Sequence, residues 1–268
     1  MKIATWNVNS LRARQGHLLD WLKANPVDAI GLQELKMQDE HFPRAEFEGM
    51  GYQAAISGQK AYNGVAILSR HGLEDVHRDI PGFTDEHKRV IAATVRGVRI
   101  VNLYVPNGQS IGSEKYAYKL RWLAALRDYL REELARHPQL VVTGDFNVAP
   151  ADADVHDPVA WDGQVLCSEP ERAAFRALLE LGLQDSFTLF PAPEQRFTWW
   201  DYRQGAFRRN RGLRIDHILV SPELSKQCQY FQIDTDTRQL ERPSDHAPVT
   251  LSLPGCETGF ANQPSGPP

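Results

Sequence analysis

The chain has few cysteines and no long hydrophobic run. Its three cysteines, Cys167, Cys228 and Cys256, are scattered through 268 residues and show neither a disulfide framework nor the spacing of a zinc site. The sequence contains no run of about 18 apolar residues, and it has no signal-peptide pattern. We therefore expect a cytoplasmic protein that has no membrane partner.

A strong excess of basic residues is also lacking. The net charge is −4, so the overall composition does not indicate a nucleic-acid-binding protein. Local charge is more informative, because residues 203–214 contain five arginines and no acidic residue. Such a stretch is more often a solvated loop, but it could also follow a phosphate backbone.

The apolar pattern predicts one domain over residues 1–253 and a disordered tail over residues 254–268, which are rich in Pro, Gly and Ser. The expected strands lie at 3–8, 27–32, 52–57, 64–69, 90–95, 98–105, 140–143, 197–200, 213–220, 230–233 and 247–253. The expected helices lie at 11–25, with Ser10 as the N-cap, at 115–136 and at 170–181. Short strands with a few interspersed helices predict two packed sheets covered by helices.

Residues 141–150, Val-Val-Thr-Gly-Asp-Phe-Asn-Val-Ala-Pro, are the most informative stretch. A buried strand leads into Gly144, which permits a turn or a close approach, and then into Asp145 and Asn147. A carboxylate and a carboxamide at an apolar strand end are costly to desolvate unless something binds them. Residues 3–9 have a weakly similar sequence, Ile-Ala-Thr-Trp-Asn-Val-Asn.

Several other predicted strands end in polar side chains in the same way. Each side chain alone has an ordinary structural explanation, such as a turn, a cap or a satisfied histidine. If these ends meet, four carboxylates crowd into one cleft and require a compensating cation. Oxygen ligands without cysteine match Mg²⁺ or Mn²⁺ rather than zinc. The polar side chains at strand ends are Asn7, Asn9, Glu34, Tyr104, Asp145, Asn147, Asp216, Asp245 and His246.

Five motifs, at residues 5–14, 30–34, 144–150, 211–216 and 243–248, together resemble the exonuclease III family. These are bacterial abasic-site endonucleases of the endonuclease/exonuclease/phosphatase superfamily. The resemblance covers residues 1–253 and implies a four-layer α/β sandwich like that of deoxyribonuclease I. It also implies a DNA-repair phosphodiesterase that depends on Mg²⁺ and accepts Mn²⁺ as a substitute.

The resemblance further implies roles for individual residues. Glu34, with Asn9 and Asp245 nearby, would hold the metal, and Asn9 stands where relatives carry Asp. Asp145 would position or deprotonate the attacking water, and either Asp145 or the pair of Asp216 and His246 would be the base. Asn7 and Asn147 would orient water and phosphate, Asp216 would orient His246, and Tyr104 would assist at the scissile phosphate.

Substrate choice is implied by a second group of residues. Trp199, Leu213 and Ile215 would wall a pocket for an extruded abasic sugar. Candidates for contact with the duplex backbone are Asn107, Lys115, Lys119, Arg208, Arg209 and Arg211. We expect a monomer that acts on double-stranded DNA with abasic sites or blocked 3′ ends, cutting 5′ to the abasic site, cleaning 3′ ends and degrading from the 3′ end. A phosphatase for inositol phosphates or lipid head groups, and a non-catalytic binding protein, are the alternatives.

Overall fold

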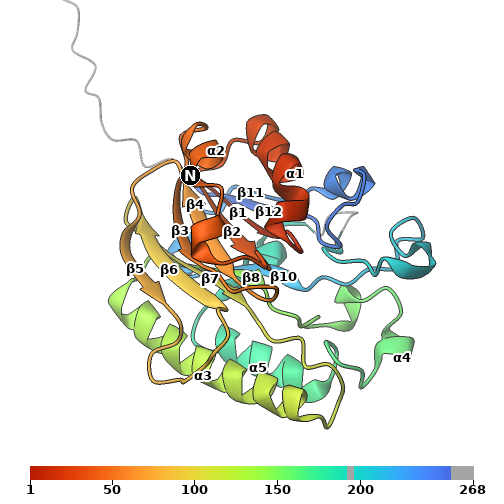
Figure 1. Cartoon of the computed structure of the whole chain (residues 1–268). Helices are drawn as coiled ribbons and strands as arrows, with labels where there is room; N and C mark the ends of the chain where they lie inside the picture. Colours follow the sequence, from red (N-terminus) through yellow and green to blue (C-terminus); the bar gives the residue numbers. More distant parts are fainter. Residues whose placement is uncertain (192–195, 255–268) are drawn as a thin grey trace, which may run out of the picture.

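Two six-stranded mixed sheets pack face to face, and helices cover the outer face of each (Figure 1). The computed structural model describes residues 1–191 and 196–254, so the predicted tail lies outside the described residues except for Pro254. The first sheet has the order β11 (Tyr230–Ile233), β12 (Val249–Ser252), β1 (Lys2–Asn7), β2 (Ala29–Gln33), β4 (Val65–Ser69), β3 (Gln53–Ser57). The second has the order β5 (Glu74–Arg78), β6 (Val90–Val95), β7 (Val98–Tyr104), β8 (Leu140–Asp145), β10 (Asp216–Val220), β9 (Gln184–Asp185).

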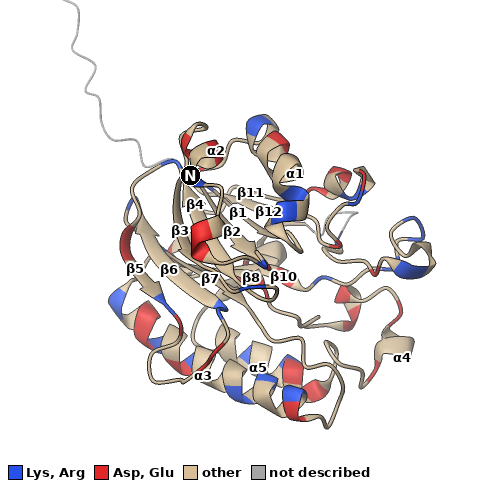
Figure 2. Cartoon of the chain, in the orientation of Figure 1, with Lys and Arg blue, Asp and Glu red and all other residues tan. Residues whose placement is uncertain are grey.

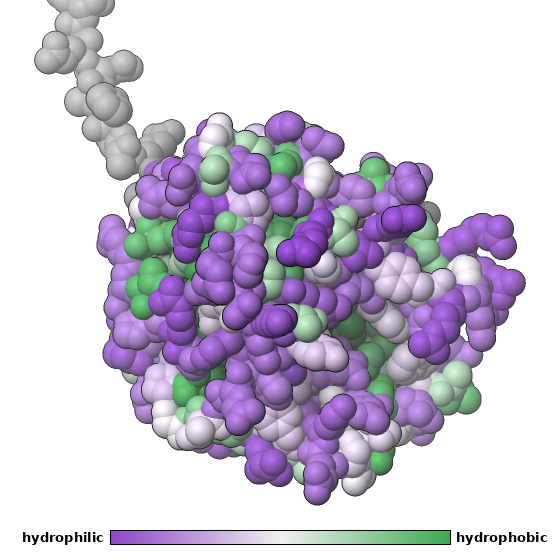
Figure 3. Space-filling view, viewed as in Figure 1, coloured by the Kyte–Doolittle hydropathy of each residue, from purple (hydrophilic) through white to green (hydrophobic). Residues whose placement is uncertain are grey.

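Three apolar cores separate the four layers. The first lies between the sheets, the second joins the first sheet to α1 (Leu11–Ala24) and α2 (Arg44–Glu48), and the third joins the second sheet to α3 (Glu114–Arg136) and α5 (Glu169–Leu179). Two shorter helices, α4 (Pro158–Trp161) and α6 (Pro222–Ser225), lie in connecting segments. The predicted four-layer sandwich is therefore confirmed. Figure 3 shows a largely hydrophilic outer surface with hydrophobic side chains recessed in places.

Some local predictions fail for clear reasons. Residues 197–200 form only isolated bridges to Leu213 and His246, so the predicted strand there is wrong. The edge strand β5 was missed because most of its side chains are exposed and carry no apolar alternation. Ser10 precedes α1 as predicted, but its side chain makes no capping hydrogen bond, and its φ of 86° is not that of an ordinary cap.

The strand directions bring the polar strand ends to one edge of the sandwich. β1 runs parallel to β2, and β7 runs parallel to β8, so each pair finishes at the same end. In register, Asn7 lies beside Gln33, and Asp145 lies between Tyr104 on one side and Asp216 on the other. Because the carboxyl ends of parallel strands meet in this way, residues far apart in sequence become neighbours.

A buried polar contact fixes the two sheets against each other just below this edge. Asn102 Nδ2 on β7 donates to the carbonyls of Leu32 and Ala66 in the other sheet, each at 2.9 Å. Gln33 Nε2 donates to Asn102 Oδ1 at 2.6 Å. Gly31 leaves the necessary room, because a Cβ there would lie 2.5 Å from Asn102 Oδ1. These contacts set the spacing of the strand ends that follow.

A second close approach, between the backbones of β8 and β7, explains why residue 144 is glycine. A Cβ at this position would lie 1.9 Å from the carbonyl oxygen of Leu103 on the adjacent strand β7. Only glycine lets β8 run this close to β7 immediately before Asp145. Among the described residues, no helix is long and apolar enough to cross a bilayer.

Candidate active site

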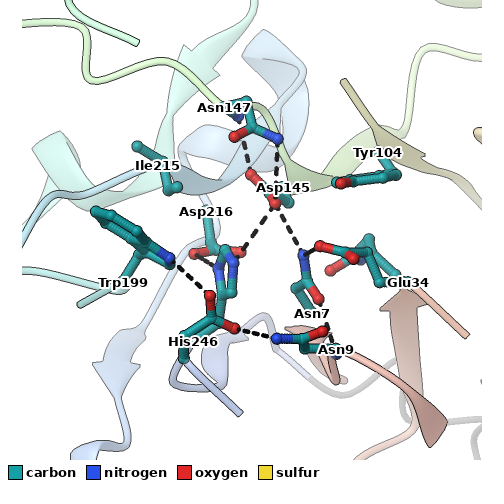
Figure 4. A network of polar contacts seen from close by, with 12 residues as sticks. Asn7, Asn9, Glu34, Tyr104, Asp145, Asn147, Trp199, Ile215, Asp216 and His246 are labelled. Carbon is teal, nitrogen blue, oxygen red and sulfur yellow. Dashed lines mark hydrogen bonds and ion pairs between the residues drawn. The ribbon is translucent and has the colours of Figure 1, made fainter. Parts of the chain in front are cut away.

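Matching hydrogen-bonded turns follow β1 and β8, and the side chains of Asn7 and Asp145 point toward each other (Figure 4). Asn7 Oδ1 accepts a hydrogen bond from the backbone N–H of Asn9 at 2.9 Å, and Asp145 Oδ1 accepts one from the N–H of Asn147 at 2.9 Å. Asn9 and Asn147 have left-handed φ angles of 44° and 49°, which Asn tolerates better than most residues. The weak sequence similarity between residues 3–9 and 141–147 therefore corresponds to matching turns. Asn7 Nδ2 links them by donating to Asp145 Oδ2 at 2.9 Å.

Asp145 is a buried carboxylate whose proton affinity is unusually high. Only 1 % of its surface is exposed. Burial and the nearby charge of Asp216 raise the pKa of Asp145 to about 7, against the opposing effect of His246 and of the hydrogen bonds from Asn7 and Asn147. The carboxylate therefore exchanges a proton near neutral pH, as a general base requires.

His246 lies between two carboxylates. Its Nδ1 is 2.8 Å from Asp216 Oδ2, and its Nε2 is 3.7 Å from Asp145 Oδ2. Burial alone would lower the pKa of His246, but the negative charges of Asp216 and Asp145 raise it to about 10. The side chain is therefore an imidazolium at neutral pH, held by Asp216 and directed toward Asp145.

Glu34, Asp145 and His246 form a cluster that fits a divalent metal ion. Each offers one ligand atom, and these atoms lie within 4.8 Å of one another. Protonated His246 has no free lone pair, which leaves the two carboxylates as the principal ligands. Asn7 Nδ2 holds the pair together by donating to Glu34 Oε1 at 2.9 Å as well as to Asp145. Oxygen ligands of this kind suit a hard cation.

The other two predicted metal ligands have different partners. Asn9 Oδ1 accepts from Lys36 Nζ at 2.5 Å, and Lys36 also lies 3.0 Å from Glu34 Oε2. Asp245 accepts from Asn9 Nδ2 and from Trp199 Nε1, each at 2.9 Å. Burial would raise the pKa of Asp245, but His246 and these hydrogen bonds lower it, so the group is a carboxylate at neutral pH. Asn9 is therefore joined to the cluster through Lys36, and Asp245 is joined to Asn9.

Tyr104 ends β7 beside Asp145. Burial, together with the charges of Glu34 and Asp145, raises the pKa of Tyr104 well above its usual value. Its hydroxyl is therefore a neutral donor at physiological pH. The guanidinium of Arg89 lies 4.8 Å from the centre of the ring and holds it in place.

The three residues predicted to form the apolar pocket differ in exposure. Trp199 is half-buried, as a pocket wall should be, whereas its neighbour Trp200 is completely buried in the core. Leu213 and Ile215 are 0 % and 1 % exposed and pack with Leu166 beneath Trp199. Leu213 and Ile215, predicted as apolar walls of the pocket, therefore lie behind the surface that Trp199 presents.

The predicted DNA contacts divide into exposed residues and one buried residue. Asn107 and Lys115 line a groove of about 570 Å³ beside Tyr104. The exposed Arg208, Arg209 and Arg211 lie on a basic loop (Figure 2). Lys119 is 0 % exposed and pairs with Glu171 at 2.5 Å. The prediction that Lys119 contacts the duplex backbone is therefore wrong.

The sequence interpretation missed three residues beside Asn9. Besides Lys36, Tyr202 accepts through its hydroxyl from Asn9 Nδ2 at 3.3 Å and from an Arg14 nitrogen at 3.2 Å. Arg14 ends the motif at residues 5–14, and Tyr202 follows the tryptophan pair, so both lay next to recognised patterns. Lys36 gave no such signal, because left-handed φ angles at Glu34 and Lys36 break the alternation expected of a strand.

Comparison with known proteins agrees with this geometry. The model of the endonuclease/exonuclease/phosphatase family matches residues 4–246. Exodeoxyribonuclease III of Haemophilus influenzae is 38% identical over 93% of this chain and 98% of its own length. A 3′ phosphatase from Neisseria, solved with a product DNA hairpin, is 49% identical with a TM-score of 0.93, covering 95% of this chain and 100% of its own. An AP endonuclease from Archaeoglobus fulgidus is 40% identical with a TM-score of 0.90, covering 94% and 99%. This chain therefore belongs to the endonuclease/exonuclease/phosphatase family, as a nuclease of the exodeoxyribonuclease III type.

Proposed function

We propose that this protein is a Mg²⁺-dependent DNA-repair phosphodiesterase. It cuts duplex DNA 5′ to abasic sites, removes blocking groups from 3′ ends and degrades DNA from the 3′ end. The observation that carries the proposal is the geometry of Asp145, a buried carboxylate that Asn7 holds and whose ligand atom lies within 4.8 Å of those of Glu34 and His246. The Neisseria relative is named a 3′ phosphatase and the Archaeoglobus relative an AP endonuclease, and we propose that this chain carries out both reactions.

In this proposal Asp145 is the general base. The sequence left Asp145 and the pair of Asp216 and His246 as alternatives, and the geometry favours Asp145, because both ring nitrogens of His246 face carboxylates, Asp216 at 2.8 Å and Asp145 at 3.7 Å. At neutral pH Asp145 can take a proton from water, whereas His246 already carries its proton. A positioned base contributes about 10²–10⁴ to the rate. The hydrogen bonds from Asn7 and Asn147 hold the carboxylate while it does so.

His246 and Tyr104 then act on the phosphate. The imidazolium, held by Asp216, offers its Nε2–H to a phosphate oxygen and balances the negative charge that develops there. The neutral hydroxyl of Tyr104 donates a second hydrogen bond from the opposite side of Asp145. Both groups are fixed before substrate arrives, so they need little rearrangement during the reaction.

Glu34 and Asp145 would hold the Mg²⁺ ion, with Asn9 joined to Glu34 through Lys36 and Asp245 joined to Asn9. A bound divalent ion supplies charge neutralisation at the phosphate oxygens. Because Asn9 is neutral, we expect it to contribute less to metal affinity than a carboxylate would.

Substrate binding in this proposal uses the surface on both sides of the cluster. Trp199 contacts the deoxyribose, Asn107 and Lys115 contact one stretch of backbone, and the exposed arginines of the basic loop contact another. With Leu213 and Ile215 behind the surface, entry of an abasic sugar requires Trp199 to move. A 3′-terminal phosphate needs no such entry. We further propose that residues 1–253 act as a cytoplasmic monomer, independently of the tail.

One assay tests the proposed function directly. Purified protein is incubated with three duplexes that carry an internal abasic site, a 3′ phosphate or an undamaged 3′ end, each with Mg²⁺ and with EDTA. We expect Mg²⁺-dependent turnover of all three, and the same turnover after deletion of residues 254–268. Release of phosphate from inositol phosphates without turnover of DNA would instead support the phosphatase alternative. Turnover in EDTA would contradict the metal requirement.

A further inference from the structure

Lys119 is a buried cation that touches no solvent and does not reach the DNA-facing surface. It lies on α3 and is 0 % exposed, as is its counter-ion Glu171 on α5. Burial lowers the pKa of Lys119, although the charge of Glu171 opposes this effect. A buried ion pair contributes little net stability compared with apolar side chains of similar size. Its presence next to the active site therefore calls for another explanation.

All three protons of the Lys119 ammonium point at defined acceptors. One is Glu171 Oε1 at 2.5 Å, and the others are the backbone carbonyls of Asn147 at 2.6 Å and Asn107 at 3.1 Å. The two asparagines also contact each other, since Asn107 Nδ2 donates to Asn147 Oδ1 at 3.1 Å. Lys119 thus holds the backbone at Asn107 and Asn147 from the buried side, opposite the candidate active site.

Asn147 needs such support because its backbone is in a left-handed conformation. Its φ is 49°, and residues held in sparsely populated conformations persist only where their surroundings determine them. Its N–H donates to Asp145 Oδ1, its Nδ2 donates to the carbonyl of Val105 at 3.0 Å, and its own carbonyl accepts from Lys119. Without Lys119, the carbonyl of Asn147 would lie buried without its donor.

Glu171 extends this support to a second left-handed residue. Leu166 has a φ of 77°, which is costly for a bulky side chain. Glu171 Oε1 accepts from the N–H of Leu166 at 3.0 Å, while Oε2 accepts from the N–H of Ser168 at 3.1 Å. The carbonyl of Leu166 in turn accepts from the N–H of Ala149, two residues after Asn147. Both ends of the ion pair therefore hold backbone next to the same turn.

We propose that the buried pair of Lys119 and Glu171 is a positioning device that fixes Asn147, and through it Asp145, in the geometry needed for catalysis. Neither residue touches substrate. The inference rests on the proposed function, because it assumes that Asn147 acts in the reaction.

The same helix offers a matched control. Arg99 and Glu133, near the other end of α3, form a second buried pair at 2.6 Å with exposures of 1 % and 2 %. This pair lies far from Asn147 along α3, and the hydrogen bonds of Arg99 go to Glu133, Asp75 and Thr94. Replacing either pair removes two buried charges from the same layer, but only one pair contacts the active-site turn.

The test compares Lys119→Met/Glu171→Gln with Arg99→Met/Glu133→Gln. Glutamine at 171 retains an acceptor for the start of α5. We expect kcat on the abasic duplex to fall at least tenfold for the first variant, with KM changed less than threefold, while the control stays within twofold of the parent protein. Thermal melts verify that both are folded at the assay temperature. Equal kcat in the two variants would overturn the proposal.

A second comparison shows whether the effect passes through Asn147. Asn147→Ala is made alone and combined with Lys119→Met/Glu171→Gln. We expect the pair substitution to cost less in the Asn147→Ala background than in the parent protein, because coupled residues are not additive. Part of the effect remains, since alanine keeps the backbone carbonyl that Lys119 contacts and the N–H that donates to Asp145. A full additional loss would overturn the proposed route. If Asn147→Ala alone keeps the parent kcat, the role of Asn147 fails while the nuclease function stands. Should the pair variant not fold, Lys119→Gln is carried through the same cycle.

Discussion

The two faces of β10 carry similar residues in opposite roles. Asp216 faces the active site, where its carboxylate contacts His246. The next residue, His217, faces the other way, where Nδ1 accepts from Arg214 at 2.9 Å and Nε2 donates to the carbonyl of Val148 at 2.9 Å. Both faces are buried, and both combine histidine with aspartates. Only one of them has the properties of a reactive site.

The difference lies in the balance of charge. Behind β10, Arg214 supplies a permanent cation to Asp154 at 2.7 Å and to Asp185 at 2.6 Å. Burial would raise the pKa of Asp185, but Arg214 and His217 lower it. On the active face no arginine pairs with Asp145 or Asp216 among the described residues, and Asp216 Oδ1 has no hydrogen-bond partner there. An aspartate–histidine contact therefore indicates chemistry only where its charges are not already balanced.

The largest expected effect is on the active face. Asp145→Asn removes the base while preserving shape, so we expect turnover to fall by about 10⁴, or about 5 kcal/mol in activation free energy. Single-turnover cleavage of an abasic duplex measures this loss. Folding raises the pKa of Asp145 from 3.8 to about 7. Ionisation of this carboxyl group therefore destabilises the folded state as the pH rises through that range. Duplex binding and the melting temperature at pH 8 should therefore not fall, and a rate within tenfold of the parent would contradict the assignment.

On the face of β10 that carries His217, a substitution should lower the stability of the protein rather than its catalytic rate. Arg214→Met leaves Asp154 and Asp185 buried without their cation, which costs about 3–5 kcal/mol. Urea unfolding measures the loss, and kcat per folded molecule should stay within threefold of the parent. A variant of normal stability but low kcat would show that the two faces are not separate.

A smaller effect on the free energy of unfolding is expected when the charge of Asp185 alone is removed. Asp185→Asn should destabilise the protein by about 1–3 kcal/mol at pH 7. A carboxylate whose pKa is lowered on folding stabilises the fold above its unfolded pKa, here near 3.8, and loses that contribution as the pH falls further. Urea unfolding of parent and variant should therefore differ by a constant amount from pH 5 to 8 and by less below about pH 4. A gap that persists unchanged to pH 3.5 would exclude this linkage.

The smallest effect concerns metal affinity. Since the pKa of Asp145 is about 7, Mg²⁺ must displace a proton below that pH. Affinity should rise up to about tenfold per pH unit, or about 1.4 kcal/mol, below pH 7 and then level off. Calorimetry in two buffers of different ionisation enthalpy measures the released proton. A Mg²⁺ affinity that is constant from pH 5.5 to 8 would show that Asp145 is not a metal ligand. The same conclusion would follow if Asp145→Asn kept the pH dependence of the parent protein.

Sequence reasoning succeeded where a pattern has one physical solution. Apolar strands that end in Asp145 and Asn7, with Gly144 forced by close packing, define the sandwich and the edge where the site lies. It failed for Lys119, because lysine is normally exposed and its partner Glu171 is 52 positions away. It also failed for Lys36, whose position follows from left-handed turns that carry no periodic signal.

The contacts between the end of β1 and residues 244–246 have a consequence for truncated forms of the chain. Trp6 Nε1 donates to the carbonyl of His246 at 3.1 Å, and Ser244 Oγ donates to the carbonyl of Asn7 at 2.6 Å. The end of β1 therefore acquires these two partners only from residues about 240 positions later in the chain. We expect a chain truncated before residue 244 to leave an abasic duplex uncut, because it lacks both contacts and His246.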